Sequence, residues 1–216
     1  MMVNKKITLL LLFIYQFFGF QSHSQTVSEI YDQTIITWYG LDFTHAKIVG
    51  EFGSSENTGK VIRDVYFKSW NDLMIDEQEK YDLKRPFHKR IVNYSFERNA
   101  ELNSSVDSDI IKLPHKSFVP ILLVDKLIQI TSKYKDECAE GIGVVFIVEC
   151  FNRSNHWSYI HITFFNRKTG DILLSQRVES QPSGTTVRNY WAGAILGAIN
   201  KVGTLWNSWR EASQSH

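Results

Sequence analysis

The segment GVVFIVEC, at residues 143–150, is apolar at consecutive positions and not only at alternate ones. Successive side chains of a strand point to opposite faces of its sheet, so both faces of this strand are apolar. Strands of this kind are covered on both sides and lie inside a sheet. We therefore expect a central strand here, covered on both faces.

Further strands are predicted on both sides of this segment along the chain. WSYIHITFF (157–165) and ILLSQRV (172–178) follow after short polar turns, which indicates a three-strand meander. Upstream, β-branched and aromatic residues favour one long or broken strand over 34–49 and another over 90–97.

Apolar residues at helical spacing predict helices over about 60–83 and 124–135, and a last helix that starts near Thr186. The polar segment ELNSSVDSD, at 101–109, is expected to be a loop. The order of elements is then β-α-β-α-β-β-β-α. This order is typical of an α/β fold with a single mixed sheet of about five strands and helices packed on it, as a two- or three-layer sandwich.

The first residues have the features of an export signal. Lys5 and Lys6 precede an apolar run at 7–20 and a small polar stretch, QSHSQ, which is the order of a secretory signal peptide. The run is shorter than the roughly 20 residues that span a bilayer. We expect residues 1–24 to be a cleaved signal peptide and 25–216 a single α/β domain, periplasmic or secreted, without a lipid-anchor cysteine or a transmembrane segment.

Charge and motifs exclude several classes of partner and cofactor. The chain has 24 basic and 23 acidic residues, and the first 24 residues include two of the lysines and no acid, so the net charge changes from +1 to −1 on cleavage. Without a basic excess we expect no nucleic-acid partner. Neither GxGxxG nor a phosphate loop occurs, and the histidines have no HxxxH or HExxH spacing, so we expect no cofactor and no metal site.

The two cysteines flank the predicted central strand. Extended residues of about 3.3 Å each place Cys138 and Cys150 more than about 20 Å apart, whereas the Cα atoms of a disulfide lie about 6 Å apart. We expect two free, buried thiols.

Three residues are candidates for chemistry. Asp42 and His45 lie three apart in an apolar stretch, so they converge only if the strand is broken there; Asp42 would then orient His45 as a general base. In an unbroken strand they point to opposite faces. Glu149 lies at the end of the central strand, where a raised pKa would be notable, although acids at strand ends more often reach water or a lysine.

The last helix has a turn before it and a glycine pair within it. Thr185 or Thr186 is expected to cap the helix N-terminus, the alternative being a turn that binds an anion. Gly193 and Gly197, with Leu196 beside them, lie off the apolar stripe. Glycine in a helix costs about 1 kcal/mol relative to alanine, so the pair suggests close approach by another backbone, from this chain or from a partner.

Four segments, ITWYGLDFTHAKIVG, KSWNDLMIDEQEKYDL, GIGVVFIVE and RNYWAGAI, resemble a group of exported proteins of unknown function from Bacteroidota. This resemblance covers nearly the whole mature chain and implies an envelope or secreted location in a Gram-negative cell. It supplies no catalytic residues. The segment NRKTGDILLSQRV with the helix after it is also similar, in fold only, to the end of curli-assembly and TolB N-terminal-type periplasmic domains.

Two functions fit these features. The first is a non-enzymatic exported module that binds another cell-envelope protein through the flank of Gly193, Leu196 and Gly197. The alternative is a small periplasmic hydrolase or ligand-binding protein that uses Asp42 and His45.

Overall fold

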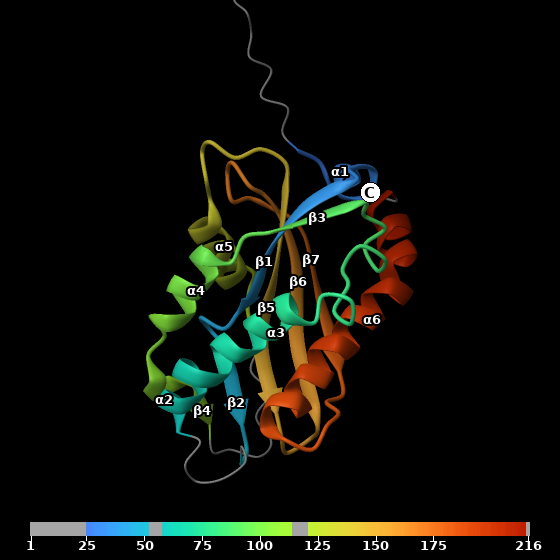
Figure 1. Cartoon of the computed structure of the whole chain (residues 1–216). Helices are drawn as coiled ribbons and strands as arrows, with labels where there is room; N and C mark the ends of the chain where they lie inside the picture. Colours follow the sequence, from blue (N-terminus) through green and yellow to red (C-terminus); the bar gives the residue numbers. More distant parts are fainter. Residues whose placement is uncertain (1–24, 52–57, 114–120, 215–216) are drawn as a thin grey trace, which may run out of the picture.

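The computed structural model describes residues 25–51, 58–113 and 121–214, and the predicted signal peptide lies outside these ranges. Seven strands of the described chain form one sheet, with helices beside it (Figure 1). The strands are β1 (Ile35–Asp42), β2 (Lys47–Val49), β3 (Ile91–Tyr94), β4 (Lys112–Leu113), β5 (Ile142–Asn152), β6 (Trp157–Asn166) and β7 (Ile172–Ser180). The helices are α1 (Val27–Asp32), α2 (Gly59–Val61), the π-helix η1 (Ile62–Phe67), α3 (Lys68–Asp76), α4 (Glu97–Ser104), the 3-10 helix η2 (Ser108–Ile110), α5 (Val124–Thr131), the 3-10 helix η3 (Ser132–Tyr134) and α6 (Val187–Gln214).

Strand β5 lies at the centre of the sheet, as the sequence predicts. Its whole length pairs antiparallel with β6, and β6 pairs in turn with β7, which confirms the meander. The other edge of β5 pairs in parallel with β1 and, further along, with β2. The predicted strand over 34–49 is therefore broken into two strands that follow each other along one neighbour. Strands β3 and β4 extend the sheet, in parallel, beyond β1 and β2.

Both faces of the sheet are covered, so the fold has three layers. Val144, Phe146 and Val148 of β5 belong to a hydrophobic cluster with residues of η1, α3 and α6. Val145 and Ile147 belong to a second cluster with residues of α4 and α5. Figure 1 shows α6 on one side of the strands and α4 and α5 on the other. The mixed α/β sandwich is confirmed. No helix in the described ranges is long and apolar enough to cross a membrane.

The structure differs from the predicted elements in the region between β2 and β4. The predicted loop at 101–109 is wrong, because residues 97–104 form α4 and a 3-10 turn follows at 108–110. The predicted helix over 60–83 ends at Asp76 and contains the π-helix η1. The wider turn of a π-helix shifts the apolar face, and Val65, within η1, is 53% exposed.

The cysteines agree with the prediction in part. Both thiols are free, but Cys150 is buried and Cys138 is exposed. Burial raises the pKa of the Cys150 thiol to about 12. Cys150 therefore stays protonated at neutral pH and is unreactive as a nucleophile.

Candidate functional site

Among the residues that the structure describes, no strand pairs with the second half of β1 on the edge away from β5. Strand β3 pairs with β1 only as far as Trp38. Beyond it, the side-chain amide of Asn71, on α3, accepts from the backbone N–H of Leu41 at 2.8 Å and donates to its carbonyl at 3.1 Å. Asn103, on α4, donates to the same carbonyl at 2.9 Å and accepts from the N–H of Phe43 at 2.7 Å. Two asparagine amides thus replace the missing neighbouring strand.

A chain of buried hydrogen bonds continues from Asn103 to the end of β1. Asn103 donates to Asn99 at 2.8 Å, Asn99 donates to the Tyr134 hydroxyl at 3.1 Å, and Tyr134 donates to Asp42 at 2.6 Å. Burial, and then the nearby Asp42 carboxylate, raise the pKa of Tyr134 well above its usual value. The phenol therefore remains a proton donor, and the network joins α4, η3 and β1 rigidly.

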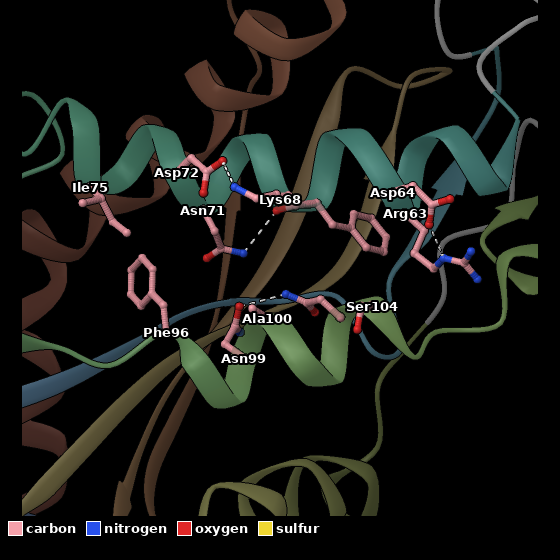
Figure 2. Close-up of a pocket in the computed structure, with 12 residues that line it drawn as sticks. Arg63, Asp64, Lys68, Asn71, Asp72, Ile75, Phe96, Asn99, Ala100 and Ser104 are labelled. Atoms are coloured by element: carbon pink, nitrogen blue, oxygen red, sulfur yellow. Dashed lines mark hydrogen bonds and ion pairs between the residues drawn. The ribbon is translucent and has the colours of Figure 1, made fainter.

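A groove of about 450 Å³ lies over this network, between η1–α3 on one side and α4 on the other (Figure 2). We call it the α3–α4 groove. Phe67, Ile75, Phe96 and Ala100 provide apolar walls; Figure 2 shows Ile75 and Phe96 facing each other from the two sides. The π-helix η1 forms one end of the groove, and π-helical segments are frequent at functional sites.

The polar residues of the groove have their hydrogen-bonding partners within the protein. The amides of Asn71, Asn99 and Asn103, which also line it, bond to backbone or to one another, as described above. At its edge, Lys68 pairs with Asp72 at 2.6 Å and Arg63 with Asp64 at 2.7 Å. Each charged side chain at the edge is thus paired with one of opposite charge, and the groove surface left for a ligand is mainly apolar. The groove therefore suits an apolar ligand.

The structure does not join Asp42 and His45 as an acid–base pair. They lie at the break between β1 and β2, but one Asp42 oxygen accepts from the backbone and hydroxyl of Thr44, at 2.8 and 2.5 Å, and the other from Tyr134. Burial lowers the pKa of His45, and the opposing effect of Asp42 does not cancel it. Asp42 thus supports the wall of the α3–α4 groove through Tyr134 and Asn99 and does not orient a base.

Glu149 has a different environment from the one predicted. Its side chain is 1% exposed and accepts hydrogen bonds from His161 at 2.8 Å, from Arg177 at 2.7 Å and from the backbone of Leu122 at 3.0 Å. Burial acts to raise the pKa of Glu149, but these hydrogen bonds outweigh it and hold the pKa at about 2. The pKa is thus lowered and not raised, and the carboxylate reaches a histidine and an arginine instead of water or a lysine. Glu149 remains a carboxylate that ties β5, β6 and β7 together.

The glycine flank of α6 packs against the chain itself. A Cβ atom at Gly193 would lie 2.3 Å from the carbonyl oxygen of Ser183, and one at Gly197 would lie 3.2 Å from the side chain of Ser180. The end of β7 and the segment between β7 and α6 therefore make the close approach that the glycines permit. Partner binding at Gly193, Leu196 and Gly197 stays a prediction.

Thr186 accepts a hydrogen bond from the N–H of Asn189 at 3.3 Å, as expected of an N-cap.

A single methyl group tests this packing. Gly193→Ala should lower the free energy of unfolding by about 2 kcal/mol, because Ser183 has to move. Gly203→Ala is the matched control on the same helix. A Cβ there would lie 3.5 Å from Pro86, an ordinary contact, so the helix should gain up to about 1 kcal/mol. Urea unfolding measures both; equal stability of Gly193→Ala and the wild type would show that the segment does not pack on this flank.

Comparison with known protein families, with characterised proteins and with solved structures finds no match to this chain. The resemblance to exported proteins of Bacteroidota therefore stays a prediction. In the described ranges no group of three or more histidine, cysteine, aspartate or glutamate side chains is arranged to hold a metal ion.

Sequence reasoning missed the residues of the α3–α4 groove. Asn99 and Asn103 are four apart and therefore share one face of a helix, which is a usable signal once α4 is known to be a helix. Nothing in the sequence indicates that Asn71, 28 residues before Asn99, acts on the same strand edge.

Proposed function

We propose that this chain is an exported, non-enzymatic binding protein whose α3–α4 groove holds a small apolar ligand. One observation carries the proposal: a groove of about 450 Å³ with apolar walls and a floor of hydrogen-bonded asparagines. Sites for small molecules have volumes of roughly 300–1,000 Å³ and are lined mainly by apolar side chains. Export follows from the signal peptide that the sequence predicts.

The geometry favours ligand binding in the α3–α4 groove over protein binding at the flank of α6 and over a site built on Asp42 and His45. The glycine flank of α6 is packed by Ser183, so the glycines require no partner protein to account for them. A hydrolase built on Asp42 and His45 lacks its central contact, because Thr44 and Tyr134 bond both oxygens of Asp42. Asp42 keeps a role in the binding protein, since its bond to Tyr134 holds Asn99 in the groove wall.

Ala100→Trp tests the proposal by filling the groove. The probe is N-phenyl-1-naphthylamine, a neutral aromatic molecule that fluoresces strongly in apolar surroundings. We expect the wild-type mature chain to bind it saturably, with one molecule per chain, and Ala100→Trp to bind at least tenfold more weakly. Ala100 is exposed on α4 and lines the groove, so the variant should keep its fold, which circular dichroism would verify.

Ala212→Trp is the matched control, an exposed alanine on α6 away from the groove. It should bind the probe as the wild type does. Equal loss of binding in both variants, or none in either, would contradict a site between α3 and α4.

A further inference from the structure

A second cavity, of about 390 Å³, is lined by the start of α4, the end of η3 and the turn between β6 and β7. Two tyrosines on its wall, Tyr39 and Tyr134, are 5% and 2% exposed and contact edge to face, with ring centroids 5.4 Å apart. We call it the tyrosine cavity. Charged side chains of both signs line it as well, namely Arg98, Lys133, Lys135, Arg167, Glu97 and Asp136. This cavity is polar where the α3–α4 groove is apolar.

Only part of this charge is paired. Arg98 pairs with Glu101 at 2.6 Å and Lys135 with Glu137 at 2.9 Å. Within the chain that the structure describes, the other four charged side chains of the cavity have no ion-pair partner within 4.0 Å; these are Lys133, Arg167, Glu97 and Asp136. Two cations and two carboxylates without an ion pair thus face one cavity, and one of these carboxylates, that of Asp136, already accepts a hydrogen bond from the backbone N–H of Cys138 at 3.0 Å.

Arg167 is held in place before any ligand arrives. Its Nε donates to the Tyr39 hydroxyl at 3.0 Å and its Nη1 to the carbonyl oxygen of Glu140 at 2.9 Å. These two bonds fix the plane of the guanidinium and leave Nη2 free to donate. A fixed guanidinium binds a carboxylate with directed hydrogen bonds and with little loss of side-chain freedom.

We propose that the tyrosine cavity binds a small zwitterion of the α-amino acid class. Its carboxylate pairs with Arg167 and Lys133, and its ammonium group pairs with Glu97 and Asp136. A simple anion fits less well, because the four cations of the cavity are matched by Glu97, Asp136 and the two carboxylates at 101 and 137, so the site has no net positive field. A ligand with both charges supplies an ion-pair partner to each of the four side chains that lack one.

Thermal unfolding of the full mature chain tests this site with a panel of the L-α-amino acids at millimolar concentration. A ligand that binds only the folded state raises the melting temperature. We expect at least one amino acid to do so, while its N-acetyl amide, which lacks both charges, and inorganic phosphate do not. No increase with any amino acid, or an equal increase with phosphate, would overturn the proposal.

Two variants locate the binding. Lys133→Gln and Asp136→Asn should each weaken the amino acid at least tenfold, as measured by titration calorimetry. Both side chains are exposed and their amide replacements keep a similar size, so the fold should be retained. Lys84→Gln, an exposed lysine outside the cavity, and Ala100→Trp, which fills the other groove, should bind normally. Unchanged binding in Lys133→Gln and Asp136→Asn would place the ligand elsewhere and refute this site.

Discussion

Glu149→Leu should lower the free energy of unfolding by about 3 kcal/mol, although the new side chain is apolar and the site is buried. The substitution leaves His161 and Arg177 without the carboxylate that they bond, and the backbone N–H of Leu122 without an acceptor. Breaking a buried ion pair by removing one partner costs about 3–5 kcal/mol. Arg177 is 30% exposed and regains some water, which places the expected loss at the lower end of that range.

Glu179→Leu is the matched control, measured by the same urea unfolding. Glu179 also pairs with Arg177, at 2.7 Å, but its side chain is 44% exposed. An exposed pair contributes about 1 kcal/mol or less, so this variant should lose little. If Glu149→Leu and Glu179→Leu have the same free energy of unfolding, the burial of the Glu149 carboxylate does not determine how much its ion pair stabilises the fold.

The same carboxylate predicts how stability depends on pH. The pKa of Glu149 is held at about 2 in the folded chain against an ordinary value of 4.5. Below 4.5 the unfolded chain takes up a proton that the folded chain resists, so this part of the stability is complete above pH 4.5 and is lost as the pH falls toward 2. The difference corresponds to about 3 kcal/mol. Glu149→Gln should show a correspondingly shallower acid dependence between these values.

The central strand was predictable because its own residues are apolar at consecutive positions, which indicates burial on both faces. Consecutive apolar residues over 143–148 suffice to place β5 between two layers, whatever its neighbours are. Helix α4 was not predictable in the same way. Its inward face carries Asn99 and Asn103 in place of apolar residues, and they are buried because their amides bond each other and residues outside α4. The pattern of apolar and polar residues along the sequence therefore shows α4 only as a polar segment.

The environment of Glu149 could not be predicted from the sequence either. The sequence places Glu149 at the end of a buried strand, where contact with water or a lysine is common and a raised pKa would be notable, but its partners lie 12 and 28 residues away. They reach it because Ile147 pairs with His161 and His161 with Arg177 across the meander. That register depends on the turns and on the irregularity between Val148 and Cys150. Hydrophobic alternation does not reveal a register of this kind.

Asn103→Leu should lower the free energy of unfolding by about 3 kcal/mol, because it removes hydrogen bonds to the backbone at the end of β1. The N–H of Phe43 loses its acceptor, and Asn99 loses the donor to its side-chain oxygen. Each buried polar group left without a partner costs roughly 1–3 kcal/mol. Asn207→Leu, at an exposed position of α6, is the matched control and should change stability by less than about 0.5 kcal/mol.

Asn71→Leu, combined with Asn103→Leu, tests whether the two amides act as one substitute strand. The carbonyl of Leu41 accepts from both asparagines, so each single variant leaves it one donor and the double variant leaves it none. The double variant should therefore lose about 1 kcal/mol more than the sum of the single losses, measured by urea unfolding with trimethylamine N-oxide present if needed. Strict additivity would mean that the two helices stabilise β1 independently. An excess loss would show that α3 and α4, the two sides of the groove, are energetically coupled through their bonds to the same strand edge.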